Sequence, residues 1–239
     1  MVVSGFHPVR ELLEKRPRAV EALFLQRGRK DARAAGIETL ARAAGVPVRL
    51  VAKEELDRLA GRANNGVAAR VAERDYDAVE DCLAGPKGKR CVLFLDEVTD
   101  PGNLGSVLRT AAAAGASVVL TERHSAGLNE AVSKTSAGAL ERVRVGRVVN
   151  AARFLGQAKE AGFWIYGASL EGESLWNVDI SGDAVLCLGS EGAGLRRLTK
   201  ETCDRLISIP MSSGAGSLNV SVAAGILVWE WLRRRTGPG

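Results

Sequence analysis

The chain has 239 residues, of which 46% are hydrophobic and 26% charged, and its formal net charge is +5 at pH 7. This length allows one large domain or two modest ones, each able to bury a core. The apolar runs are too short and too polar to span a membrane, and the first residues lack the layout of a secretion signal. We therefore expect a soluble, cytoplasmic protein whose mild positive charge leaves polyanions open as partners.

The cysteines and histidines argue against a metal centre. The four cysteines stand far apart without a C-x-x-C pair, at Cys82, Cys91, Cys187 and Cys203. This spacing excludes a zinc ribbon and favours structural thiols over a disulfide framework. His7 and His124 are separated by most of a domain, so the sequence offers no set of metal ligands.

Residues 1–75 alternate between helical and strand-like patterns. The helical spacing of Val9, Leu12 and Leu13 predicts a helix over residues 7–15. The further segments that we expect to be regular are helices at 36–45 and 53–61 and strands at 19–26, 46–51 and 66–73. This alternation predicts a small α/β domain over residues 1–75.

The amino-acid composition changes after residue 75. The stretch RDYDAVEDCLAGPKGKR, residues 74–90, is polar and ends in Gly, Pro and basic residues. Such a composition is typical of a linker, with room for a short helix. We place the linker at residues 76–88 and a second domain at residues 89–239.

The second domain begins a new alternation of strands and helices at Cys91. The expected strands are 91–98, 117–122, 142–149, 163–169, 184–191 and 205–211. The expected helices between them are 103–115, 129–141, 150–162 and 196–204. Continuous apolar strands that alternate with helices predict a parallel sheet covered on both faces.

Ligands of a parallel α/β sheet bind beyond the carboxyl ends of the strands, and three segments there are unusual. In the first, LDEVTDPGNLGSVLRTAAAAG, Asn103 stands where a helix N-cap is expected and Arg109 at the edge of the buried helical stripe. Taken alone, this pattern also suits a turn, a capping Asn and a surface Arg.

The second segment, LCLGSEGAGLRRLT, places Glu191 among three glycines directly after a strand. Glycines allow the backbone to approach a ligand closely, although such turns also end strands for steric reasons alone. The order G-x-x-G-x-G is not the dinucleotide fingerprint, and no Gly-Lys-Ser/Thr of a P-loop follows.

The third segment, IPMSSGAGSLNVSVAAGILVWEWLRRR, joins a Ser-Gly run to a helix that is apolar on nearly all sides. Such a helix must be covered on nearly all sides, and we expect part of the cover to come from another subunit. Ser217 and Asn219 suit a ligand site, but also an N-cap and a polar residue of the first helical turn.

Together the three segments place five polar side chains at one sheet edge, namely Asn103, Arg109, Glu191, Ser217 and Asn219. This set contains neither a histidine base nor an activated cysteine. It therefore suits a reaction that depends on positioning more than on strong acid–base catalysis.

Three ordered stretches resemble the three motifs of the SpoU (TrmH-like) RNA ribose 2′-O-methyltransferases of the SPOUT superfamily. They are DPGNLGSVLRTAAAAG (the first motif, 100–115), LGSEGAGL (the second motif, 188–195) and ISIPMSSGAGSLNVSVAAGI (the third motif, 207–226). The stretches GFHPVRELL and GVAARV look like the substrate-binding domain of a bacterial subgroup that methylates guanosine in large-subunit ribosomal RNA.

This resemblance implies a catalytic domain with a deep trefoil knot, preceded by a small RNA-binding domain similar to a ribosomal protein. S-adenosylmethionine would sit in the knot, with Gly189, Ile209 and Leu218 at the positions where the family contacts the cofactor. The five polar residues fall on the family's functional positions. The family works as a homodimer with the last helix in the interface. From composition and residue spacing we expect neither a metal nor a membrane as a partner.

The resemblance also suggests a mechanism, in which a ribose 2′-hydroxyl attacks the methyl carbon of the cofactor. Arg109 stays protonated, so its expected role is to bind an RNA phosphate and to stabilise the developing alkoxide. Asn103 and Ser217 would orient the arginine and the hydroxyl, and Asn219 and Glu191 would hold the loop and the cofactor.

Two departures from the family pattern bear on the ligand sites. The third motif usually has a glycine two residues after its methionine, where this chain has Ser213 followed by Gly214. In the first domain Asn64 and Asn65 replace a His-Gln pair that often precedes the glycine of the last strand. The cofactor loop and the RNA site are therefore expected to differ in detail.

Other functions remain open on sequence alone. The same chemistry could act on transfer RNA, on another ribosomal position or on an antibiotic-resistance site. A different class of function is a non-catalytic RNA-binding factor of ribosome assembly, against which the intact polar set argues. A nucleotide-dependent dehydrogenase is excluded because the G-x-G-x-x-G turn is missing. Binding of S-adenosylmethionine separates the first class from the other two.

Overall fold

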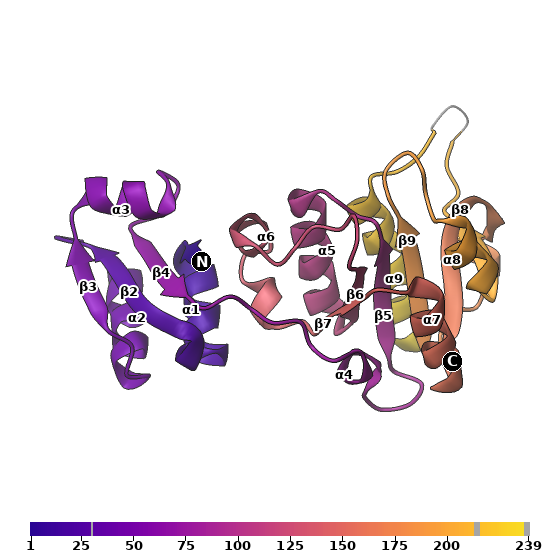
Figure 1. Ribbon diagram of the computed structural model, residues 1–239, viewed down its shortest axis with the longest axis horizontal. Coiled ribbons are helices and arrows are strands. Elements are labelled where there is room, and N and C mark those ends of the chain that lie inside the picture. Colours follow the sequence, from indigo (N-terminus) through magenta and orange to yellow (C-terminus); the bar gives the residue numbers. More distant parts are fainter. Residues whose placement is uncertain (30, 213–215, 237–239) are drawn as a thin grey trace. The chain divides into compact units, whose positions relative to one another are not determined.

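The protein is described by a computed structural model that covers residues 1–29, 31–212 and 216–236. It consists of two compact units (Figure 1). Unit 1 comprises Met1–Asp75 with Gly127–Arg142, and unit 2 comprises Tyr76–Ala126 with Val143–Gly239. None of the described helices is long and apolar enough to cross a membrane.

Unit 1 is a four-stranded sheet of order β1-β4-β2-β3 with helices on both faces. Its elements are β1 (Val2–Ser4), α1 (Phe6–Lys15), η1 (Pro17–Ala19), β2 (Val20–Gln26), α2 (Ala32–Ala43), β3 (Val48–Val51), α3 (Lys53–Ala60), β4 (Val67–Val71), α6 (Glu130–Thr135) and η2 (Ala139–Glu141). Helices α1 and α2 pack on the face that carries Leu23 and Leu25, and α3 packs on the face that carries Phe24.

The elements of unit 1 differ from the sequence prediction at three places. Strand β1 was not predicted, because three residues carry too short an alternation. Helix α2 begins at Ala32 rather than at residue 36, because the Asp31 Oδ1 accepts a hydrogen bond of 2.9 Å from the Ala34 N–H and caps the helix. The helix predicted at 129–141 is interrupted, because Gly138 has a φ of 90° that ends α6 before η2.

The asparagine pair that departs from the family pattern builds the turn before β4. Asn64 is buried, its Nδ2 donates to Asp57 Oδ1 at 2.7 Å and to the Gly61 carbonyl at 2.6 Å, and its Oδ1 accepts from the Gly66 N–H at 2.7 Å. Asn65 adopts a left-handed φ of 55°, which asparagine tolerates better than most residues. Asn64 therefore shapes this loop through its side-chain hydrogen bonds, and Asn65 through its left-handed backbone.

Unit 2 is a six-stranded parallel sheet of order β10-β8-β9-β5-β6-β7. Its elements are α4 (Val79–Leu83), β5 (Cys91–Asp96), α5 (Pro101–Ala114), β6 (Ser117–Thr121), β7 (Val145–Val148), α7 (Ala151–Glu160), β8 (Trp164–Ser174), η3 (Leu175–Asn177), β9 (Ala184–Gly189), α8 (Arg197–Thr202), β10 (Arg205–Ser208) and α9 (Val220–Thr236). The predicted parallel sheet is thus confirmed.

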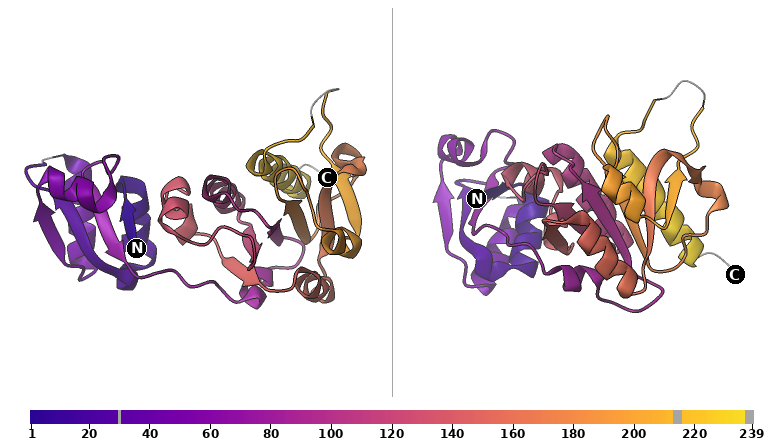
Figure 2. Two further views of the ribbon diagram at one scale, coloured as in Figure 1. Left: turned by 45° about the horizontal axis from the view of Figure 1, so that its top comes forward. Right: turned by 45° about the vertical axis from the view of Figure 1, so that its right-hand side comes forward.

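Helices cover both faces of this sheet, as the continuous apolar strands predict (Figure 2). Helices α4 and α7 bury Cys82, Phe154 and Leu155 against one face. On the other face α5 and α9 pack against each other and against β6 and β9. The side chain of Trp231 in α9 is fully buried, and its Nε1–H donates to the Gly182 carbonyl at 2.8 Å.

Several predicted boundaries in unit 2 differ from those of the structure, and two of them bear on the candidate site. Helix α5 begins at Pro101 and is capped by Asp100, whose Oδ1 accepts from the Asn103 N–H at 2.7 Å. Asn103 therefore lies in the first turn and is not the N-cap. Strand β8 continues to Ser174, five residues beyond its predicted end, because its second half pairs with β10 after a register shift.

Candidate functional site

The carboxyl ends of the parallel strands lie at one edge of the sheet in unit 2. The residues that follow β5, β9 and β10 there belong to the first, second and third motifs. Because neighbouring parallel strands end at the same edge, segments nearly a hundred residues apart meet in space.

A hydrogen-bonded cluster joins the three motifs at this edge. The Asn103 Nδ2 donates to Glu191 Oε1 at 2.9 Å. The Asn219 Nδ2 donates to the same Oε1 at 2.6 Å and to Asn103 Oδ1 at 2.8 Å. One residue from each motif therefore takes part in a closed set of side-chain contacts.

Asn219 has a second task at the start of α9. Its Oδ1 accepts from the Ser221 N–H at 3.0 Å and from the Ser221 hydroxyl at 2.6 Å, so Asn219 satisfies a free amide of the first helical turn. Ser217 lies two residues earlier and does not begin the helix. The capping alternative was therefore wrong for both residues, since Asn219 caps α9 from the position before the helix and Ser217 lies outside it.

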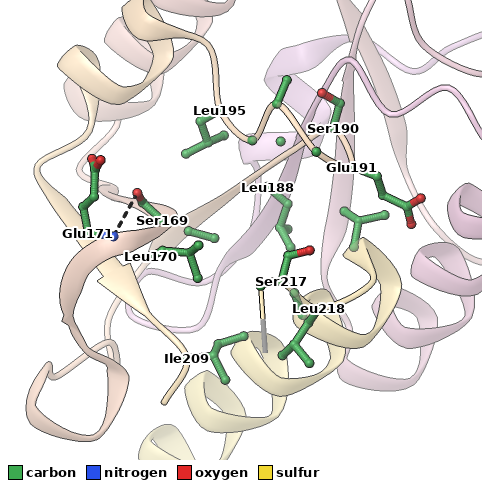
Figure 3. Close-up of a pocket in the computed structure, with 18 of the residues that line it drawn as sticks. Ser169, Leu170, Glu171, Leu188, Ser190, Glu191, Leu195, Ile209, Ser217 and Leu218 are labelled. Carbon is green, nitrogen blue, oxygen red and sulfur yellow. Dashed lines mark hydrogen bonds between the residues drawn. The ribbon is translucent and has the colours of Figure 1, made fainter. Parts of the chain in front are cut away.

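A cavity of about 330 Å³ lies beside this cluster (Figure 3). Its described lining residues come from the middle of β8, from the ends of β9 and β10 with the segments that follow them, and from the segment before α9. They include Ser169, Leu170, Glu171, Leu188, Gly189, Glu191, Leu195, Ile209, Met211, Ser217 and Leu218. Figure 3 shows Ser169, Leu170 and Glu171 on one side of the cavity and Glu191 on the other. The predicted cofactor positions Gly189, Ile209 and Leu218 all line it.

The second motif can fold back over the cavity only because residue 189 is a glycine. A Cβ at Gly189 would overlap the backbone of Gly194 and Leu195. Gly192 and Gly194 adopt positive φ values of 87° and 68°, which glycine reaches without strain. The glycine spacing of this motif therefore reflects a tight backbone turn along the cavity wall.

A buried carboxylate holds the far end of the same turn. Asp96, the last residue of β5, is fully buried. Its Oδ1 accepts from the Arg196 Nε at 2.7 Å, and its Oδ2 accepts from the Arg196 N–H at 3.2 Å and the Thr199 hydroxyl at 2.7 Å. The sequence alone does not reveal this role of Asp96, because its partners lie about a hundred residues further along the chain.

The sequence prediction missed the contribution of β8 to the cavity. The cavity is lined by Ala168, Ser169, Leu170 and Glu171. The predicted strand ends at residue 169, and none of these residues is among the predicted site residues. The rule that ligands lie at carboxyl strand ends also applies to this strand. The change from the apolar FWIYG to the polar ASLEGES is the feature of the sequence that could have indicated these lining residues.

Arg109 stands apart from the other predicted site residues. It is exposed on α5 and does not line the cavity. Within residues 1–29, 31–212 and 216–236 its side chain makes neither a hydrogen bond nor an ion pair. Its guanidinium group is therefore available for a ligand or partner outside the chain.

The chemistry of the cavity is that of a binding site with little acid–base capacity. Among its described lining residues the ionisable side chains are Glu171, Glu191 and Lys200. Beneath it, burial raises the pKa of the Cys187 thiol in β9, so this thiol stays protonated at neutral pH and serves as a core residue. No group of three potential ligands in the described part of the chain could hold a metal ion.

Two family models match separate parts of the chain. Residues 90–229 match the SpoU rRNA Methylase family. The chain belongs to this family. Residues 2–77 match the domain described as RNA 2′-O ribose methyltransferase substrate binding, so the SpoU catalytic region is preceded by a substrate-binding domain. The departure of the third motif at Ser213 lies outside the described residues.

Relatives match the SpoU chain over nearly its full length. A 23S rRNA (guanosine-2′-O-)-methyltransferase RlmB from Xanthomonas campestris is 43% identical over 98% of this chain and 97% of the relative. The RlmB protein of Pseudomonas aeruginosa is 41% identical over 98% of this chain and 96% of its own.

Solved structures share the fold. AviRb, a SpoU methyltransferase of Streptomyces viridochromogenes in complex with AdoMet, has a TM-score of 0.84 at 27% identity and covers 100% of this chain and 91% of its own. An AdoMet-bound rRNA methyltransferase of Sinorhizobium meliloti has a TM-score of 0.82 at 26% identity, over 99% and 88% of the two chains.

Proposed function

We propose that the protein transfers a methyl group from S-adenosylmethionine to the ribose 2′-hydroxyl of a guanosine in 23S ribosomal RNA. The observation that carries this proposal is the hydrogen-bonded cluster of Asn103, Glu191 and Asn219 beside the cavity. It supports a single site built from all three SpoU motifs. The RlmB relatives supply the substrate class.

The cavity suits S-adenosylmethionine in size and chemistry. Its volume of about 330 Å³ lies within the range of sites for small molecules. Leu188, Ile209 and Leu218 offer apolar walls for the adenine ring. The cofactor carries two cationic groups and a carboxylate, which Glu171, Glu191 and Lys200 can complement.

When bound, the cofactor supplies an electrophilic methyl group, and the chain supplies positioning. Asn103, Glu191 and Asn219 fix the relation between the three motifs, so that both reactants meet in one geometry. The Ser217 hydroxyl lines the cavity and can hydrogen-bond the attacking ribose oxygen. Such alignment lowers the barrier without a strong base.

Arg109 is proposed to bind the RNA phosphate next to the target ribose and to stabilise the charge that develops on its oxygen. Its planar guanidinium can donate two parallel hydrogen bonds, which the ammonium group of lysine cannot. We expect an Arg109→Lys variant to bind S-adenosylmethionine normally but to lose about 100-fold or more of its methyl transfer rate. Turnover near that of the unchanged protein would exclude this role.

Helix α9 presents an apolar stripe that the chain itself leaves open. Val222 and Trp229 are 49% and 48% exposed, and Ile226 between them is only half-buried. The spacing of these residues places them on one helical face. A second copy of the chain is proposed to cover this stripe, so that the enzyme is a homodimer. A Trp229→Glu variant should then sediment as a monomer, whereas a dimeric variant would place the interface elsewhere.

Because Arg109 does not line the cavity of its own chain, we propose that it completes the site of the second copy. Two inactive variants, Arg109→Ala and Ser217→Ala, then test this across a mixed dimer. If the arginine acts across the interface, random mixing restores about a quarter of full activity, since half of the dimers are mixed and each contains one complete site. If it acts within its own chain, the mixture remains inactive.

The finer architecture is also proposed from the family. The chain would divide into an RNA-binding domain at residues 1–75, a linker at 76–88 and a catalytic domain at 89–239, although Gly127–Arg142 of the last range belong to unit 1. The end of the chain would pass through a loop formed by the second and third motifs, which makes a deep trefoil knot. The cytoplasm, where ribosomal RNA is available, would be its place of action.

The function is tested by methyl transfer to RNA made in vitro, which carries no prior modification. Labelled S-adenosylmethionine is incubated with 23S rRNA, 16S rRNA or transfer RNA, and the product is digested and analysed by mass spectrometry. We expect 2′-O-methylguanosine in 23S rRNA alone. Methylation of another RNA would correct the substrate. Binding of RNA without methyl transfer by a protein that also fails to bind the cofactor would indicate an assembly factor.

A further inference from the structure

The positive charge of the protein is concentrated in its first part. Residues 1–75 contain fifteen Lys and Arg against ten Asp and Glu, whereas residues 76–239 contain eighteen of each. The whole excess of +5 therefore belongs to residues 1–75. An excess of this kind attracts a polyanion, although it does not say which face of the domain meets it.

Two arginines of unit 1 converge on one aromatic ring. The Arg70 guanidinium carbon lies 5.5 Å from the centroid of the Phe24 ring, and that of Arg49 lies 5.9 Å from the same centroid. In the sheet Phe24 of β2 pairs with Arg49 of β3, and Ala22, two residues before it, pairs with Arg70 of β4. The three side chains share the sheet face on which α3 packs.

These arginines have no carboxylate partner within the described residues. Other arginines of this unit do have one, since Arg10 pairs with Glu14, Arg29 with Asp31 and Arg42 with Glu38. Arg49 and Arg70 are exposed, whereas Phe24 beneath them is only 5% exposed. Stacking on the ring fixes each guanidinium group and leaves its N–H groups directed to solvent.

We propose that this Arg49–Arg70 face, made of Arg49, Arg70 and the Phe24 ring that holds them, binds phosphates of the RNA backbone. The inference rests on the proposed function for the identity of the RNA. Pre-positioned guanidinium groups suit phosphate oxygens, because they donate paired hydrogen bonds with little loss of side-chain entropy. Contacts of this kind set the orientation of the RNA and carry no base preference.

The test compares two double variants of the full-length protein in binding to 23S rRNA transcribed in vitro. Arg49→Gln/Arg70→Gln removes both charges from the proposed face. Arg10→Gln/Arg42→Gln is the matched control, because it removes the same charge from ion-paired residues of α1 and α2 on the opposite face. The dissociation constant is measured against salt concentration, with the melting temperature and the affinity for S-adenosylmethionine measured alongside.

We expect the Arg49–Arg70 variant to lose about tenfold in affinity for each arginine. The slope of log affinity against log salt should fall by about 0.7–0.9 for each lost phosphate contact, while the control keeps the slope of the unchanged protein. Equal slopes for both double variants would overturn the inference. Absence of RNA binding by the unchanged protein would instead overturn the proposed function.

A charge-preserving variant separates phosphate binding from packing on Phe24. Arg49→Lys/Arg70→Lys keeps both charges and should retain the salt slope, even if its affinity is lower. Loss of the slope in this variant as well would show that the arginines act only by covering the ring, and the inference would be wrong. If the double Gln variant does not fold, the single variants Arg49→Gln and Arg70→Gln are compared in the same way.

Discussion

At the scale of single residues, Asn219 joins helix capping to the assembly of the site. Its Oδ1 accepts from Ser221, whereas its Nδ2 donates to Asn103 and Glu191. An Asn219→Asp variant separates these tasks, because aspartate keeps the accepting oxygen and loses the donor. It also places a negative charge within contact of the Glu191 carboxylate.

We predict that Asn219→Asp leaves the melting temperature nearly unchanged but lowers kcat/KM for methyl transfer by about tenfold or more. The control is Asn150→Asp, since Asn150 caps α7 through the Arg153 N–H and has no part in the site. Full activity of Asn219→Asp would show that the cluster is dispensable.

Gly189 offers a second test at this scale, because its lack of a side chain lets the second motif close along the cavity. A Cβ added at this position would overlap the backbone of Gly194 and Leu195, so we predict that Gly189→Ala costs about 1–3 kcal/mol of stability and weakens binding of S-adenosylmethionine. Gly156→Ala in α7 is the control. No heavy atom lies within 4 Å of its added Cβ, and it should stabilise the protein by about 1 kcal/mol. Calorimetric titration that finds unchanged cofactor affinity in Gly189→Ala would contradict the first prediction.

The sequence indicates which residues belong to the candidate site, but it does not indicate their hydrogen-bond partners. The set Asn103, Glu191, Ser217 and Asn219 was found from motif positions, and the structure brings its members to one edge. The role of Asp100 as the cap of α5 was missed, because Asn103 three residues later has an equally good capping side chain. Local patterns cannot choose between two such residues when the start of the helix is set by Pro101.

At the scale of elements, the end of α9 is stabilised by a buried carboxylate. Glu230 is 6% exposed and accepts from Arg233 and Arg234, and Arg234 also donates to the Trp176 carbonyl at 3.0 Å. The hydrogen bond from Arg233 lowers the pKa of the Glu230 carboxyl. A lowered pKa in the folded state means that this carboxylate stabilises the protein above its unfolded pKa, about 4.3, and that the contribution is lost as the pH falls through the folded value.

We therefore predict that Glu230→Gln melts at a lower temperature than the unchanged protein at pH 7, and that this difference shrinks as the pH falls below the unfolded pKa of about 4.3. Glu201→Gln is the control, because the Glu201 carboxylate is exposed and its pair with Arg197 contributes little. A difference for Glu230→Gln that is independent of pH would contradict the predicted linkage.

The order of the elements was largely predictable because α/β alternation leaves strong periodic patterns. The failures lie where tertiary contacts override local sequence. Strand β8 extends beyond its apolar core because β10 pairs with its polar second half, and the helix at 129–141 breaks at Gly138. The sequence predicts that the last helix is apolar on nearly all sides, and the structure shows which of its residues the chain leaves exposed.

At the scale of the whole molecule, the excess positive charge and the cavity lie in different parts of the chain. The basic excess lies in residues 1–75, and the cavity lies in unit 2, whose residues come from the balanced remainder of the chain. This is the arrangement expected of an enzyme that attracts RNA with one part and performs chemistry with another. The Arg49–Arg70 face could not be found from sequence. Its two arginines are 21 residues apart, on strands whose pairing the sequence does not reveal.

The most direct measurement is a crystal structure of the protein with S-adenosylmethionine bound. We predict that the cofactor occupies the cavity between β8, β9 and the start of α9, touching Gly189, Ile209 and Leu218, with Asn103, Glu191 and Asn219 still hydrogen-bonded beside it. Arg109 of the second copy should face the methyl group. A cofactor bound elsewhere, or a cavity left empty at saturating cofactor, would contradict the proposal that the three motifs build one methyl-transfer site.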